Sequence, residues 1–248
     1  MPAPVILLHG LRTSATMWRQ QVEALEARGI PTYAVDLPGH GTRLNERFTL
    51  PLALAAVDAA VGRAAAETGE KPYLVGFSLG GYLSIEWAAT EHHRIAGLLA
   101  ASCATTPHPV IMVVWRMLAK GIHLFPDRGR ALNDAVVRLF VPTPGSQDVL
   151  AGGVALEVMD DVLRDLSTLR PLTRLPEIDV PVLFVNGALD HIRIEARRYL
   201  AATPNARLVT VPRATHMVNV THPAAFTDAL LDGYRDATGP TAPRGSSS

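Results

Sequence analysis

Short apolar runs recur along the chain, and longer amphipathic or alanine-rich segments separate them. The apolar runs lie at residues 5–8, 32–35, 73–75, 95–100, 182–185 and 208–211. Most are continuous rather than alternating, which is typical of strands buried on both faces of a parallel sheet. Helices are predicted between most of them, at residues 16–28, 52–67, 79–91, 192–202 and 224–235. Strands that alternate with helices predict an α/β fold with right-handed crossovers.

One long stretch, from about residue 106 to residue 175, interrupts this alternation and contains no good strand. Helices are predicted there at residues 108–122, 129–140 and 154–169, and prolines and a glycine at 142–145 separate the last two. We therefore expect an α/β core formed by residues 1–105 and 172–237 and a helical insertion over the sheet at residues 106–171. The Pro/Gly/Ser-rich tail at residues 238–248 is expected to be disordered.

Composition narrows the class of protein. The chain has 248 residues, enough for one domain with a substantial core, and its 48% hydrophobic content is that of a globular protein. Lys+Arg and Asp+Glu both total 23, which gives no support for nucleic acid or an anionic membrane as a partner. Cys103 is the single cysteine, so no intrachain disulfide is expected. No signal peptide or membrane span is apparent, which predicts a cytoplasmic protein.

The segment at residues 76–80 reads GFSLG and lies between a predicted buried strand and a predicted helix. This is the context of a nucleophile elbow, in which a sharp turn strains the serine backbone and glycines remove the clashes. The helix that begins at Leu79 directs its free N–H groups toward Ser78, so the Leu79 N–H is expected to bind an oxyanion. The competing interpretation is a structural glycine-rich turn.

A serine nucleophile needs a base, and the base needs an orienting acid. Asp190 follows the fifth predicted strand, and His216 follows the sixth. Because sites in open α/β sheets form at the carboxyl ends of the strands, both are expected close to Ser78. Alone, Asp190 is better explained as a helix N-cap and His216 as a surface histidine. Their coincident placement in the order Ser, Asp, His predicts a catalytic triad instead.

The first strand ends in His9-Gly10, which allows the following loop to turn back over the serine. The Leu11 N–H is therefore expected to be the second oxyanion donor, and His9 to have a structural role within the loop. No H-E-x-x-H, paired-cysteine, G-x-G-x-x-G or phosphate-loop pattern occurs, so no metal, nucleotide or other cofactor is predicted.

Further motifs carry a family resemblance. DLPGHG occupies residues 36–41, RLPEIDVPVLFVNGALD leads to Asp190, and THMVNVTHP surrounds His216. With the elbow, they make the chain resemble the serine α/β-hydrolases over nearly its whole length. The resemblance implies a mainly parallel sheet flanked by helices, with a helical cap inserted after the fourth strand. The two antiparallel strands that often open the fold are missing, so about six strands are expected, as in the family's smaller methylesterase-like and hydroxynitrile-lyase-like members.

The first functional hypothesis is a carboxyl-ester hydrolase that works through an acyl-enzyme, with ester, lactone and thioester substrates left open. A hydroxynitrile lyase of this family would be expected to carry a lysine after the base, where this chain has Met217. Perhydrolysis of the haloperoxidase-like kind and C–C bond hydrolysis remain alternatives on the same scaffold. A receptor-like binding protein is another alternative, because fold alone does not determine function.

The predicted cap supplies a hypothesis about the substrate. Residues 110–118 read VIMVVWRML, with one charge in nine residues, which is more apolar surface than one packing face uses. Part of this helix is expected to pack on the sheet, and Met112, Trp115 and Met117 are expected to line a pocket. The pattern predicts a small-molecule substrate with an uncharged, apolar acyl or alcohol group. The oligomeric state is left open.

Overall fold

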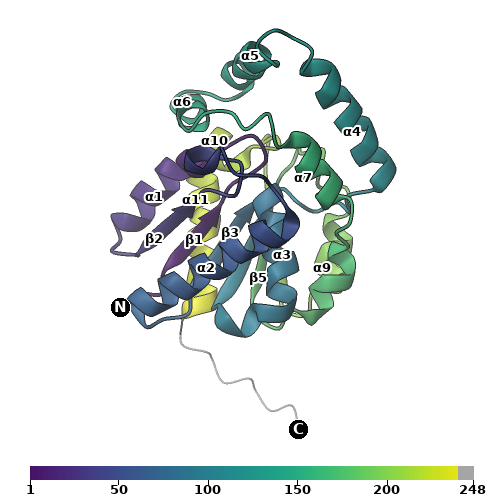
Figure 1. Ribbon diagram of the computed structural model, residues 1–248. Helices are drawn as coiled ribbons and strands as arrows, with labels where there is room; N and C mark the ends of the chain where they lie inside the picture. The colour runs from purple at the N-terminus through teal and green to yellow at the C-terminus, as the bar shows by residue number, and fades with distance from the viewer. Residues whose placement is uncertain (240–248) are drawn as a thin grey trace.

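The computed structural model describes residues 1–239, which form a six-stranded sheet covered by helices on both faces (Figure 1). The strand order is β2-β1-β3-β4-β5-β6, and all neighbouring strands are parallel. The strands are β1 (Val5–Leu8), β2 (Thr32–Val35), β3 (Tyr73–Phe77), β4 (Gly97–Ala101), β5 (Val182–Gly187) and β6 (Ala206–Val211). This confirms the predicted α/β-hydrolase fold and its parallel sheet. Most of the tail predicted at residues 238–248 lies outside the described residues.

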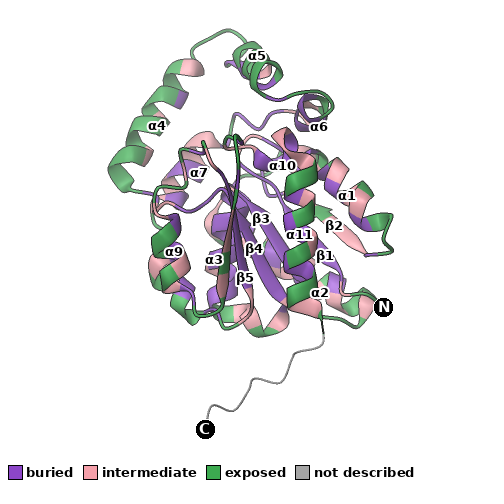
Figure 2. Ribbon diagram, turned by 180° about the vertical axis from the view of Figure 1, so that it is seen from behind, coloured by how far each residue is buried: buried purple, intermediate pink, exposed green. Residues whose placement is uncertain are grey.

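Helices cover the two faces of the sheet and produce its two apolar clusters. The helices of the core are α1 (Arg19–Glu26), α2 (Leu50–Thr68), α3 (Leu79–Glu91), α9 (Ala196–Ala202), α10 (Val218–Thr221) and α11 (Pro223–Thr238). Successive strand residues point to opposite faces. Ile6 and Leu8 therefore pack in the cluster with α2 and α3, whereas Val5 and Leu7 pack in the cluster with α1 and α11. Because both faces are covered, the central strands are continuous apolar runs (Figure 2).

Short 3-10 turns and one late helix start refine the predicted boundaries. The 3-10 turns are η1 (Ala15–Trp18), η2 (Gly41–Arg43), η3 (His92–Arg94) and η4 (Leu175–Glu177). The segment predicted as one helix over residues 16–28 divides into η1 and α1, and α9 begins at Ala196 rather than at residue 192. Among residues 1–239, no helix has the length and apolar character that crossing a membrane requires.

The residues between β4 and β5 form helices, most of which lie beyond the carboxyl ends of the strands (Figure 1). They are α4 (Pro109–Ile122), α5 (Arg130–Phe140), α6 (Gly145–Ala151), α7 (Met159–Leu166) and α8 (Pro171–Arg174). The sequence pattern missed α6, because its proline and glycine signals indicated a break. Pro144 is the N-cap of α6, a position where the missing proline N–H costs nothing. The helix predicted from residue 154 begins only at Met159.

The sequence predicted that part of helix α4 packs on the sheet, and this prediction was wrong. It stands above the core next to α7, and Val110, Val114 and Met117 are exposed (Figure 2). Its apolar character therefore does not reflect burial in the sheet core. The side of α4 that faces the core instead borders a cavity above the carboxyl ends of the strands.

Candidate active site

Ser78 occupies the sharp turn between β3 and α3. Its backbone angles are φ 50° and ψ −111°, outside the regions that non-glycine residues normally adopt. A Cβ on Gly76 would lie 2.5 Å from Ser84 Oγ, and one on Gly80 would lie 2.8 Å from the His9 carbonyl oxygen. Both approaches are too close for a side chain, so glycine is required at both positions. The turn thereby has the geometry predicted for a nucleophile elbow.

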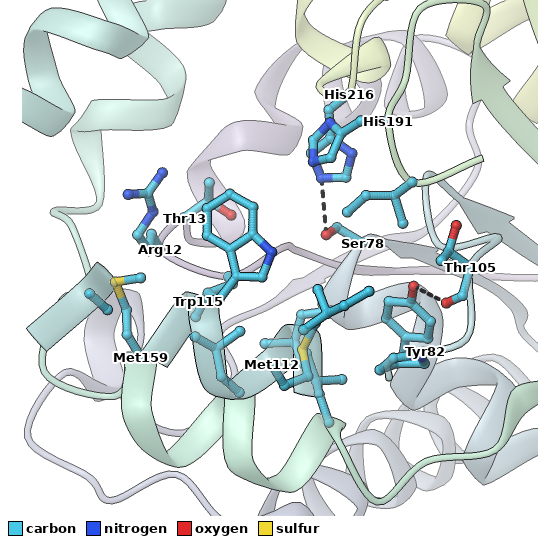
Figure 3. Close-up of a pocket in the computed structure, with 18 of the residues that line it drawn as sticks. Arg12, Thr13, Ser78, Tyr82, Thr105, Met112, Trp115, Met159, His191 and His216 are labelled. Carbon is cyan, nitrogen blue, oxygen red and sulfur yellow. Dashed lines mark hydrogen bonds between the residues drawn. The ribbon is translucent and has the colours of Figure 1, made fainter. Parts of the chain in front are cut away.

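Ser78, His216 and Asp190 are brought together by three loops at the carboxyl edge of the sheet. His216 Nε2 is 3.1 Å from Ser78 Oγ, and His216 Nδ1 is 3.0 Å from Asp190 Oδ1 (Figure 3 shows the contact with Ser78). An ionised carboxylate only accepts hydrogen bonds, so Nδ1 carries the hydrogen and Nε2 is free to accept the proton of Ser78. Asp190 Oδ1 also accepts the Ile192 N–H at 2.8 Å. Asp190 is not a helix N-cap, because α9 begins at Ala196 with Glu195 as its N-cap; the bond from Ile192 instead fixes the turn after β5.

The Asp190 side chain is fully buried, yet its environment favours the ionised form. Burial raises its pKa, but the hydrogen bond and the charge of His216, together with the Ile192 N–H, lower it by more, so the pKa lies below its ordinary value. A negative charge is thus held against the imidazole at neutral pH. This is the electrostatic condition for stabilising a protonated His216 during a reaction.

Ser102 contacts the site, although the sequence analysis did not assign it there. It follows β4 at the same edge of the sheet, with a left-handed φ of 52°. Its Oγ donates a hydrogen bond to the His216 carbonyl oxygen at 2.8 Å. The one signal available in the sequence was its position directly after a buried strand. The contact restrains the backbone of the loop that carries the imidazole.

His9 is a structural residue of the loop after β1, as the sequence predicted. Its Nδ1 donates to the Gly10 carbonyl oxygen at 2.8 Å, and its Nε2 accepts the Leu37 N–H at 3.0 Å. Both ring nitrogens are thereby occupied in a fully buried position. Asp36 fixes the adjoining DLPGHG turn by accepting the Ala15 N–H at 2.7 Å and the Thr42 N–H at 2.8 Å.

An apolar cavity of about 460 Å³ opens over the serine. Ser78, His216 and the two predicted oxyanion donors, Leu11 and Leu79, all line it. Helices α4 to α7 supply much of the remaining wall, in which apolar side chains predominate (Figure 3). The site therefore combines a polar group of three residues with a mainly apolar chamber.

The three side chains predicted to form the substrate pocket do not all do so. Met112 and Trp115 line the cavity, but Met117 does not and is 63% exposed. The reason is helical geometry, because residue 117 lies about 200° around the helix from residue 115. The prediction for Met117 was therefore wrong.

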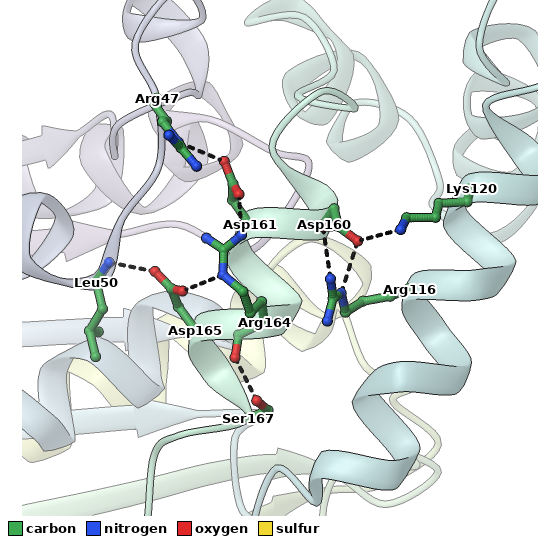
Figure 4. Close-up of polar contacts among 9 residues, drawn as sticks. All are labelled: Arg47, Leu50, Arg116, Lys120, Asp160, Asp161, Arg164, Asp165 and Ser167. Carbon is green, nitrogen blue, oxygen red and sulfur yellow. Dashed lines mark hydrogen bonds and ion pairs between the residues drawn. The ribbon is translucent and has the colours of Figure 1, made fainter.

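Helix α7 connects α4 to the core through ion pairs (Figure 4). The Arg116 guanidinium of α4 donates to both carboxylate oxygens of Asp160, at 2.8 and 3.0 Å. On the other side of α7, Asp165 accepts the Leu50 N–H at 2.8 Å, and Asp161 pairs with Arg47 at 3.3 Å. The wall of the cavity is thereby fixed to α2 and the loop before it.

One cluster in the described part of the chain has the composition of a metal site. Ligand atoms of Asp190, His191 and His216 lie within 4.8 Å of one another. A cation there would have to take Nδ1 of His216 from Asp190, and His191 is 67% exposed. The hydrogen bonds among Ser78, His216 and Asp190 already account for the positions of Asp190 and His216 in this cluster.

Comparison with known proteins identifies the family. The family model of the alpha/beta hydrolases matches residues 5–229, and the chain belongs to this family. It is 29% identical to the pimeloyl-[acyl-carrier protein] methyl ester esterase of Edwardsiella ictaluri and 28% identical to that of Pectobacterium atrosepticum, each over 92% of both chains.

Solved structures show the same fold. The enol-lactonase from Burkholderia xenovorans LB400 superimposes with a TM-score of 0.77 at 22% identity, covering 94% of this chain and 92% of the other. The bromoperoxidase from Bacillus anthracis superimposes with a TM-score of 0.77 at 21% identity, covering 95% and 93%.

Proposed function

We propose that the protein is a serine hydrolase that cleaves a carboxylic ester, lactone or thioester of an apolar small molecule through an acyl-enzyme. The observation that carries the proposal is the hydrogen-bonded series Ser78, His216 and Asp190, of which Ser78 and His216 line an apolar cavity. The similarity to methyl ester esterases over 92% of both chains supports ester hydrolysis as the reaction. Residues 106–171 are assigned as the cap and residues 1–105 with 172–237 as the catalytic core.

The mechanism follows from the hydrogen-bond directions. His216 Nε2 takes the proton of Ser78 as Oγ attacks the carbonyl carbon of the substrate. The buried Asp190 carboxylate stabilises the resulting imidazolium, and the N–H groups of Leu11 and Leu79 bind the oxyanion. His216 then gives the proton to the leaving oxygen or sulfur, which departs and leaves an acyl-serine. His216 then takes a proton from water as the water oxygen attacks the acyl carbon, and returns that proton to Ser78 Oγ as the acid departs.

Covalent labelling tests the nucleophile. A fluorophosphonate probe should modify Ser78 in the wild type, and Ser78→Ala should abolish the modification. Ser167→Ala serves as a matched control, since Ser167 lies at the end of α7, bonded to the Arg164 carbonyl oxygen. Peptide mapping by mass spectrometry identifies the modified residue. Labelling of another serine, or equal labelling of Ser78→Ala, contradicts the proposal.

A p-nitrophenyl ester series tests the reaction and the apolar cavity together. Each buried methylene contributes about 0.8 kcal/mol, or roughly fourfold in kcat/KM. The specificity constant should therefore rise from acetate to medium chains until the cavity is full. Steady decline from acetate contradicts an apolar acyl site, and absence of turnover with every ester would favour a receptor-like protein.

A further inference from the structure

Arg12 is an unusual charged residue within the candidate active site. It directly follows the proposed oxyanion donor Leu11, is partly buried and lines the cavity over Ser78. Among residues 1–239, its guanidinium makes no hydrogen bond or ion pair. The other arginines without a partner in that part of the chain are exposed, namely Arg130, Arg138, Arg197 and Arg213. Arg12 therefore combines partial burial with unused hydrogen-bond donors.

This combination has a free-energy cost. A partly buried charge loses hydration, and proteins normally compensate by pairing it. Burial lowers the pKa of Arg12, and no neighbouring carboxylate acts against that shift. An arginine nevertheless stays protonated at neutral pH, so a fixed positive charge lies in the cavity wall.

The backbone at Arg12 is also strained. Its φ is 65°, a left-handed conformation in which a side chain costs roughly 1 kcal/mol and glycine costs nothing. Ser78 and Ser102 also have a positive φ and follow strands at the carboxyl edge of the sheet, as does the exposed Arg213 after β6; Arg128 in the cap has a positive φ too. Such strain is concentrated at functional sites. A glycine would make this turn without strain, so an arginine at this position carries a small backbone cost.

The rest of the cavity offers no internal partner for this charge. No Asp or Glu is among the described residues that line it. On the side where Figure 3 draws Arg12, the labelled neighbours are Thr13, Trp115 and Met159. Thr13 Oγ1 is committed to the Gly10 carbonyl oxygen at 2.8 Å. The guanidinium is thus a single cation in a mainly apolar wall, with its donors available to a ligand.

We propose that Arg12 binds a carboxylate carried by the substrate. This inference rests on the proposed function and specifies its substrate class: an ester or lactone with an apolar chain that ends in a carboxylate. A carboxylate accepts two parallel N–H bonds from a guanidinium, and low surrounding polarity strengthens such bonds. One cation matches the single charge of a carboxylate better than the double charge of a phosphate. This carboxylate differs from the uncharged acyl or alcohol group expected from the sequence.

A matched pair of esters tests this selectivity. p-Nitrophenyl hydrogen adipate and p-nitrophenyl hexanoate have six-carbon acyl chains that end in a carboxylate and a methyl group, respectively. The wild type should show a kcat/KM at least tenfold higher for the adipate ester. The ratio of the two constants should fall at least tenfold in Arg12→Met, which keeps apolar bulk without charge, and recover in part in Arg12→Lys. Each variant's hexanoate rate is its own reference, so a general loss of activity leaves the ratio interpretable.

A binding measurement separates this inference from the proposed function. In the Ser78→Ala protein, monomethyl adipate should raise the melting temperature more than dimethyl adipate does, and adding Arg12→Met should remove the difference. If neither ester is turned over but this difference is present, carboxylate binding stands and ester hydrolysis fails. If hexanoate is hydrolysed through Ser78 but Arg12→Met leaves the ratio unchanged, the carboxylate site is overturned. Stronger stabilisation by hexyl phosphate than by monomethyl adipate would overturn the choice of carboxylate.

Discussion

The buried histidines His9 and His40 predict that the protein loses stability as the pH falls below neutrality. Both are fully buried, with ring centroids 4.9 Å apart. Burial and the neighbouring His40 lower the pKa of His9 from 6.5 to about 3, against smaller opposing effects of the hydrogen bond to the Gly10 backbone and of Asp36. Burial likewise lowers the pKa of His40 from 6.5 to about 4. Protonating His9 would also break its bond from the Leu37 N–H.

The direction and size of the effect follow from proton linkage. Below pH 6.5 the unfolded chain binds a proton at each histidine, whereas the folded protein binds none until about pH 3 to 4. Unfolding therefore takes up protons, and stability decreases as the pH falls through this window. At about 1.4 kcal/mol per pH unit, each histidine lowers the free energy of unfolding by about 2 kcal/mol between pH 7.5 and pH 5. The pair lowers it by about 4 kcal/mol.

Urea unfolding at pH 7.5 and pH 5 measures this loss. His40→Gln, which has one titrating group fewer, should lose about 2 kcal/mol less than wild type over this interval. His93→Gln is the control, because His93 is exposed and should leave the wild-type loss unchanged. An equal loss in wild type and His40→Gln would refute the assignment of pH sensitivity to this buried pair.

Two further substitutions test the site and the turn. Asp190→Asn should reduce kcat by about 10⁴-fold with the circular dichroism spectrum unchanged, because an amide no longer fixes the tautomer of His216; a rate near that of wild type would remove Asp190 from the mechanism. Gly76→Ala should lower the free energy of unfolding by about 1–3 kcal/mol or more, since the new methyl group would meet the Gly80 carbonyl. Gly62→Ala is the control, because Gly62 lies within α2 and the nearest atom to its new methyl group is in the Arg94 side chain at 3.7 Å. It should stabilise the protein by about 0.5–1 kcal/mol. Equal effects of the two alanines would contradict the steric argument.

The sequence by itself determined the sheet and the three residues at its edge. Continuous apolar runs require strands covered on both faces, which is why the central strands were found close to their true bounds. The glycines around Ser78 mark a turn that few other residue types permit. Parallel strands end at one edge, so the chain positions of Asp190 and His216 were enough to predict that they meet Ser78.

Only the tertiary structure decided how the cap helices lie and which side chains face the cavity. Hydrophobic periodicity shows that a helix has an apolar face, but it does not show what covers that face. In the structure α4 lies beside α7, joined to it through Arg116 and Asp160, and Met117 is exposed. Arg12 and Ser102 were missed for the same reason, because an arginine and a serine in loops have no distinctive local pattern. Their importance depends on partners, or on the lack of them, supplied by residues far away in the chain. Such long-range arrangements arise from packing, which local sequence does not encode one position at a time.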